Sequence, residues 1–152
     1  MLLAEFNVNL TQIRNWKMKI IKVTLMLFVV FLSACNKEGE GGSGTIEGKV
    51  IIQLINENTL DTLATYEAQD EKVYIVYGEE STSGDDTRTT YNGNYAFDYL
   101  YKGEYTIYAY SECLLHLEDC PGESEAVIKS VTISSSSESV KMPTITINKY
   151  TK

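Results

Sequence analysis

The stretch YNGNYAFDYLYKGEYTI, residues 91–107, contains the clearest fold signal in this 152-residue sequence. Tyr95 and Phe97 alternate with polar neighbours, and Tyr105 and Ile107 repeat the pattern after a turn. Alternation of this kind is typical of β-strands with one buried face. The stretch therefore predicts two short strands whose apolar side chains enter a common core.

Strand patterns continue on both sides of this stretch. Every second residue is apolar or glycine from Ile46 to Leu54, and the alternation returns from Val73 to Tyr77. No segment after residue 44 has convincing helical periodicity. Seven short strands separated by turn signals predict an all-β fold, an immunoglobulin- or transthyretin-like β-sandwich over residues 45–152.

Three connections follow from local chemistry. Asn92-Gly93 predicts a hairpin turn, because both residues tolerate positive φ. Residues 56–70 are expected to form a polar connection without a strand of their own. Residues 126–133 and 140–147 are expected to pair with each other across a serine-rich turn.

Two motifs resemble a known family of domains. TIEGKV, residues 45–50, is similar to the x-I-x-G-x-V opening strand of transthyretin-like, carboxypeptidase-regulatory-type domains. Residues 91–107 resemble the central G-x-Y-x-F-x-x-L-x-x-G-x-Y-x-I signature of the same family. The resemblance extends to about residue 148 and implies a β-sandwich, whereas it says little about function.

The N-terminal region has the pattern of a secretion signal. Lys19 and Lys22 precede ten apolar residues, 23–32, which are too few to span about 30 Å of hydrocarbon. We expect residues 1–34 to be a signal peptide. Met18 is an alternative translation start, because it opens directly onto this charged segment.

The end of the signal segment predicts a lipid anchor. LSAC, residues 32–35, resembles the lipobox of bacterial lipoproteins, which implies a diacylglyceryl group on Cys35 and palmitate-type acylation. Residues 35–44 are then the lipidated N-terminus and a flexible, glycine-rich linker. The acidic segment 37–40 resembles export signals of Bacteroidetes-type lipoproteins, so we expect attachment to the outer membrane, on its periplasmic or its exposed side. An uncleaved membrane anchor is the alternative.

The net charge argues against nucleic-acid binding. Removing residues 1–34 takes away four of 13 basic and one of 21 acidic residues, which leaves a net charge of 9 − 20 = −11. Such a surface repels phosphate backbones and anionic headgroups. Membrane attachment is therefore assigned to the acyl chains alone.

The two cysteines beyond Cys35 predict a disulfide. Cys113 and Cys120 would pair in an oxidising envelope once lipidation has used the third cysteine. The alternative is a metal-binding accessory or enzyme component, because His116 completes a Cys-x2-His-x3-Cys arrangement in the 113–120 loop. Zinc needs further ligands, and the spacing matches no known metal signature, so no metal or cofactor is predicted.

The candidate binding residues are tyrosines. The chain has one histidine and no nucleophile elbow, phosphate loop or zinc-protease motif, so no enzyme activity is predicted. Tyr74, Tyr108 and Tyr110 fall on outward positions of predicted strands and would form an aromatic strip if those strands are neighbours. Such strips contact proteins or glycans, although tyrosine also simply covers sheets well.

Overall fold

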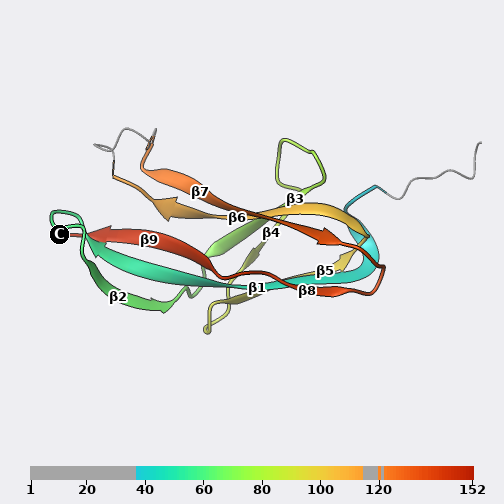
Figure 1. The fold of residues 1–152 in the computed structure, drawn as a ribbon, viewed down its shortest axis with the longest axis horizontal. Helices are drawn as coiled ribbons and strands as arrows, with labels where there is room; N and C mark the ends of the chain where they lie inside the picture. The colour runs from blue at the N-terminus through green and yellow to red at the C-terminus, as the bar shows by residue number, and fades with distance from the viewer. Residues whose placement is uncertain (1–36, 115–119, 121) are drawn as a thin grey trace, which may run out of the picture. The chain divides into compact units, whose positions relative to one another are not determined.

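The computed structural model describes residues 37–114, 120 and 122–152, which belong to one compact unit. Every regular element in this part of the chain is a strand, and the strands form two sheets that lie one over the other (Figure 1). The predicted all-β sandwich is confirmed, with nine strands in the described residues instead of seven. The strands are β1 (Glu40–Asn56), β2 (Thr62–Glu67), β3 (Lys72–Tyr77), β4 (Asp85–Arg88), β5 (Asn94–Leu100), β6 (Gly103–Glu112), β7 (Ser124–Ile133), β8 (Ser139–Lys141) and β9 (Ile145–Thr151).

The first sheet is organised around β1. The N-terminal half of this 17-residue strand pairs antiparallel with β5 and parallel with β8. Its C-terminal half pairs antiparallel with β2 and parallel with β9. The predicted pairing of residues 126–133 with 140–147 is therefore wrong, because the serine-rich turn between them carries the chain from one sheet to the other.

The second sheet has the strand order β4-β3-β6-β7, and all its pairs are antiparallel. A turn forms at Asn92-Gly93, as predicted: Gly93 has φ +74° and its N–H donates to the Thr90 carbonyl oxygen at 2.9 Å. However, it joins β4 and β5, which lie in different sheets, so it does not make a hairpin. The Gly93 carbonyl oxygen accepts a bond from the Val50 N–H at 2.8 Å, which ties the turn to β1.

The core lies between the sheets and is built from the alternating residues that the sequence indicated. Each buried strand contributes every second side chain, and the opposite positions face solvent or the sheet edges. The pattern follows directly from the period of two along a strand. The fully buried large side chains are Ile46, Val50, Val73, Ile75, Leu100, Tyr105, Ile107, Ile133, Ile145 and Ile147.

The structure differs from the prediction at the start of the domain. Residues 40–44 belong to β1 instead of a flexible linker, and residues 37–39 are also bound. The Gly39 N–H donates to the Tyr105 hydroxyl at 3.2 Å, and the Gly39 carbonyl accepts from the Tyr101 N–H at 2.9 Å. The Lys37 ammonium also pairs with Glu80. Glycine composition predicted flexibility here, but backbone pairing and buried hydroxyls hold the segment in place.

Residues 56–70 also differ from the prediction, because they contain β2. This strand pairs with β1, and all six of its residues are exposed. Leu60 precedes it in a turn with φ +61° and is 55% exposed. Because no residue of β2 is buried, the sequence of this strand lacks the clear alternation that reveals the other strands.

No helix in the described residues is long and apolar enough to cross a bilayer. The predicted signal peptide, Cys35 and His116 lie outside the described residues.

Candidate binding face

The three candidate tyrosines lie side by side on the outer face of the four-stranded sheet. Tyr74 of β3 pairs directly with Tyr108 of β6. Their neighbours Ile75 and Ile107 are fully buried in the core, so the tyrosines point the other way. Tyr110 lies two residues further along β6, on the same face. The predicted aromatic strip is therefore present as a structural feature.

The three rings pack against one another. The rings of Tyr74 and Tyr108 are stacked, with centroids 4.9 Å apart and planes 11° from parallel. The ring of Tyr110 meets both edge-on, at 5.7 Å from Tyr74 and 5.6 Å from Tyr108. Both arrangements are favourable geometries for aromatic pairs. The cluster is thus partly preformed, which reduces the entropy lost when a partner binds.

An exposed isoleucine extends the cluster toward the edge of the sheet. Ile128 of β7 pairs with Tyr108, so its side chain shares the outer face. It is 58% exposed, and Tyr110 is 48% exposed. We call the surface formed by Tyr74, Tyr108, Tyr110 and Ile128 the tyrosine face. Sequence reasoning missed Ile128 because the apolar run of residues 126–128 has no alternation to show which residue faces outward.

Charged residues border the tyrosine face on the β4 side. The Lys72 ammonium lies 5.6 Å from the centroid of the Tyr74 ring and 3.2 Å from a carboxylate oxygen of Asp86. Because this ion pair is exposed, it adds little stability. It does occupy part of the surroundings of the Tyr74 ring, which also stacks on Tyr108. Tyr110 is consequently the ring with most area available for a partner.

The tyrosine hydroxyls add polar contacts to this surface. Burial raises the pKa of Tyr108, while a hydrogen bond with Ser83 acts in the opposite direction. The hydroxyl therefore stays protonated at neutral pH and can both donate and accept hydrogen bonds. A surface of this kind offers apolar area and hydrogen-bonding groups together, as binding surfaces do.

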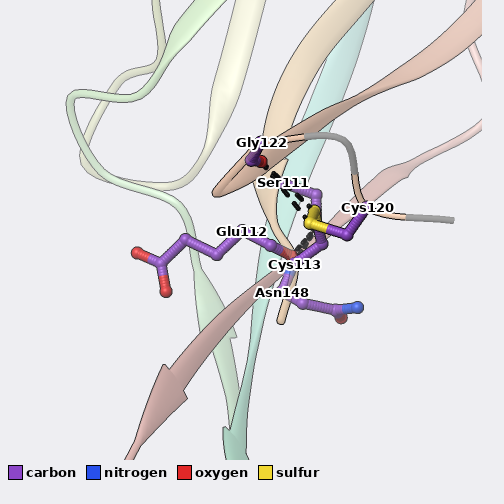
Figure 2. The surroundings of a disulfide bond; sticks show 6 residues. All are labelled: Ser111, Glu112, Cys113, Cys120, Gly122 and Asn148. Atoms are coloured by element: carbon purple, nitrogen blue, oxygen red, sulfur yellow. Dashed lines mark hydrogen bonds between the residues drawn. A yellow bond between two sulfur atoms is a disulfide. The ribbon is translucent and has the colours of Figure 1, made fainter. Parts of the chain in front are cut away.

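The disulfide between Cys113 and Cys120 is present, as predicted. The two Cα atoms are 5.9 Å apart, within the usual range, and Cys120 is only 7% exposed. Figure 2 shows the bond just after β6, with both sulfur atoms near the Gly122 carbonyl oxygen, at 3.7 Å and 3.4 Å. Each sulfur is bonded to the other, so the alternative metal site lacks its two thiolate ligands in this state.

A separate hollow of about 670 Å³ is lined by residues of β1, β4, β5 and the region around β8. Its basic side chains are largely engaged: Lys49 pairs with Glu67 at 2.7 Å, and Arg88 pairs with Asp70 at 3.2 Å. The described residues contain no group of three or more histidine, cysteine or acidic side chains placed to hold a metal ion.

No protein-family model and no curated protein sequence matches the chain. Among solved structures, the chain is similar to a proposed carbohydrate binding protein from Pseudomonas aeruginosa. The identity is 16% and the TM-score 0.45, and the match covers 73% of this chain and 91% of the other. A likeness at this level assigns no function.

Proposed function

We propose that this protein is a lipid-anchored lipoprotein of the bacterial envelope whose β-sandwich is a non-catalytic binding module. The observation that supports binding is the tyrosine face, where Tyr110 and Ile128 are both about half exposed. Exposed aromatic and aliphatic groups gathered on one face mark an interaction site more often than single exposed residues do. The chain's strong negative charge makes this uncharged cluster stand out from the rest of the surface.

The arrangement favours a protein partner. A sugar ring stacks on an aromatic face that lies open to solvent, but one face of Tyr74 is covered by Tyr108 and Lys72 lies near its ring. Tyrosine and isoleucine bordered by an ion pair instead resemble a small interface with an apolar centre and a polar rim. Glycan binding is the second candidate, and the half-exposed ring of Tyr110 is the observation that favours it.

The proposed anchor rests on the LSAC motif and the apolar segment before it. The family proposed for the sandwich, the transthyretin-like, carboxypeptidase-regulatory type, rests on the motifs at residues 45–50 and 91–107. Gly48 fits this family pattern physically, because a Cβ there would lie 2.3 Å from the Tyr95 ring. In this proposal the protein sits at the outer membrane and has no nucleic-acid partner.

Site-specific photo-cross-linking in cells tests the binding face. A photoreactive amino acid at Ile128 should give a discrete adduct with a protein, and Tyr110→Ser should abolish that adduct. The matched control is the same photoreactive residue at Thr132, which is exposed on the same face of the same strand. Equal adducts from both positions, or an adduct unaffected by Tyr110→Ser, would contradict the proposal.

Calorimetric titration with soluble cell-wall oligosaccharides tests the second candidate. If glycans bind through the tyrosine face, Tyr110→Ala should weaken binding at least tenfold, whereas Glu47→Ala on the other sheet should not. Heat changes that are the same for both variants would exclude this face as a glycan site.

Metabolic labelling tests the anchor. Radiolabelled palmitate should enter the protein, and Cys35→Ser should remove the label and shift the protein out of the membrane fraction. Protease access to a tagged domain in intact cells then distinguishes surface exposure from the periplasmic side. Unchanged fractionation of Cys35→Ser would contradict a lipid anchor at this residue.

A further inference from the structure

Strand β2 is an exposed edge strand of the first sheet. Among the described residues it pairs only with β1, and all six of its residues are exposed. Leu63 is 54% exposed and Tyr66 46% exposed, and Leu60 in the adjoining turn is 55% exposed. Three of the seven most exposed large apolar side chains in the described residues therefore lie on this strand or beside it.

The backbone of β2 has hydrogen-bonding groups that point away from β1. The Ala68 N–H, just after the strand, donates to the Val50 carbonyl oxygen at 3.2 Å. Because successive residues of a strand direct their backbone groups to opposite sides, Tyr66 and Ala64 also face β1. The N–H and C=O groups of Thr65 and Glu67 then face outward, where a further strand would lie. Leu63 has no partner on β1, because the register shifts there by one residue in a bulge.

Three other edge strands, β4, β7 and β9, are protected by recognised means. The edge strand β4 has four residues, of which three are charged. On β7, Lys129 pairs with the buried Ile107 and so points toward the core side, where a charge discourages strand addition. The β9 edge is covered, because side chains of β6 accept its N–H groups: Ser111 bonds Asn148 at 2.9 Å and Glu112 bonds Tyr150 at 2.8 Å.

β2 has none of these three features, and its one irregularity, the bulge at Leu63, leaves residues 64–67 regularly paired with β1. Its sequence, TLATYE, contains no proline and no basic residue, and its one charge, Glu67, is paired with Lys49 at 2.7 Å. An edge of this kind is a ready template for strand pairing. Neutrality at this edge, on a chain with net charge −8, makes it the place where two acidic copies can approach with least repulsion.

We propose that β2 pairs antiparallel with β2 of a second copy of this chain, so that the first sheet continues across a two-fold axis. Antiparallel pairing makes one edge complementary to itself, as a two-fold interface requires. With Thr65 opposite Thr65 of the second copy, Tyr66 lies opposite Ala64, and Glu67 lies next to the bulge residue Leu63. Large side chains then face small or apolar ones, and the two Glu67 residues are about 13 Å apart along the strands.

Cysteine cross-linking on the full chain in its membrane fraction tests this register. Thr65→Cys should form a reducible dimer under mild oxidation, because directly opposed Cα atoms in such a pair lie about 5.5 Å apart, within reach of a disulfide. The matched control is Thr132→Cys, an exposed threonine on the protected edge strand β7. Thr132→Cys should give no dimer. Equal dimer from both variants would overturn the proposal.

Analytical ultracentrifugation of the detergent-extracted full chain supplies a second, independent measurement. The unsubstituted protein should dimerise in a concentration-dependent way, and Thr65→Lys should raise the dissociation constant at least tenfold while circular dichroism stays unchanged. Thr132→Lys should have no effect. A monomer at all concentrations, or adducts of Thr65→Cys with other proteins only, would overturn pairing with a second copy.

This test is separate from that of the tyrosine face. Tyr110→Ser lies on the other sheet and should leave the dimer intact, so a failure of either proposal is recognisable without the other.

Discussion

Strands β3 and β6 carry tyrosines on both faces, and the two sets have different contacts. On the inner face, the Tyr77 and Tyr105 rings meet edge-on at 6.0 Å, and their hydroxyls bind the N-terminal segment. On the outer face, Tyr74, Tyr108 and Tyr110 pack mainly on one another. The same residue type therefore holds the domain together on one face and forms an exposed cluster on the other, which we propose as the binding face.

The two sets of tyrosines differ in the hydrogen-bond partners of their hydroxyl groups. The Tyr105 hydroxyl is part of a buried network with the backbone of Gly39 and donates to the Tyr101 carbonyl oxygen at 2.6 Å. Its removal would leave buried backbone groups without partners. The outer hydroxyls lie near solvent, where water replaces any lost bond. Inner tyrosines should therefore matter for stability and outer tyrosines for binding.

The largest effect is expected from crowding the inner face. Gly48→Ala places a methyl group 2.3 Å from the Tyr95 ring, so either the ring or β1 must move. We expect a loss of about 3 kcal/mol in the free energy of unfolding. Urea denaturation measures it, and Glu47→Ala, at the exposed neighbouring position, is the control. A loss below about 1 kcal/mol in Gly48→Ala would show that the core adapts to the added methyl group.

Removing single hydroxyls compares the two faces directly. Tyr105→Phe should destabilise the fold by about 1.5 kcal/mol, because the Gly39 N–H and the Tyr101 carbonyl lose a buried partner. Amide exchange at Gly39 should also become faster. Tyr108→Phe is the matched outer variant and should change stability by less than about 0.5 kcal/mol. Equal effects of the two substitutions would remove the distinction between the faces.

High pH should lower the stability of the fold through two tyrosines that face the inside of the sandwich, Tyr95 and Tyr77. Burial raises the pKa of Tyr95 to about 12, and burial together with Glu40 raises that of Tyr77 to about 12. The folded state thus binds these protons more tightly than the unfolded state, where the pKa is about 10. Stability should be intact below pH 10 and fall between pH 10 and 12, by at most about 1.4 kcal/mol per pH unit for each group.

Chemical denaturation at pH 9, 10.5 and 11.5 checks this dependence. Tyr95→Phe should make the decline shallower, whereas Tyr110→Phe should not. An unchanged profile in Tyr95→Phe would mean that its phenol does not titrate in this range.

Removing the hydroxyl of Tyr95 should stabilise the protein, in contrast to the loss of stability expected for Tyr105→Phe. The Tyr95 hydroxyl is buried and has no hydrogen-bond partner. Since an unpaired buried polar group is costly, Tyr95→Phe at neutral pH should stabilise the protein by about 1 kcal/mol. Thermal unfolding followed by circular dichroism measures it. A destabilised Tyr95→Phe would show that the hydroxyl has a partner in solution.

The smallest effect on stability is expected on the outer face. Tyr110→Ser should lower the free energy of unfolding by only about 0.5 kcal/mol, because the side chain is half exposed. The same substitution should nevertheless abolish the adduct at Ile128. A variant that binds normally would leave the outer tyrosines with only the role of covering the sheet.

The sequence predicts the core well because alternation survives wherever one face is buried. Ile46, Val50, Tyr95 and Ile107 could all be placed without coordinates. The outward direction of Tyr74 and Tyr108 followed from the same period of two. Their direct pairing did not, because a register between distant strands depends on how the whole sheet assembles.

The parts that escaped prediction lack such alternation. β2 is exposed on all positions, so its side chains carry no burial pattern. Residues 39–44, at and just before the start of β1, contain four glycines, a composition that indicates flexibility. There the order comes from remote partners, above all the Tyr105 hydroxyl, which no local sequence signal reveals.

The bound segment at the start of the domain has a mechanical consequence for any anchor at Cys35. A flexible nine-residue linker could extend to about 30 Å from its attachment point. With the backbone held from Gly39 onward, only four residue steps remain, which reach about 14 Å at full extension. A domain held this close to its lipid would rotate and diffuse together with the lipid. Which of its surfaces neighbouring molecules can reach would then depend on the fold of the domain itself.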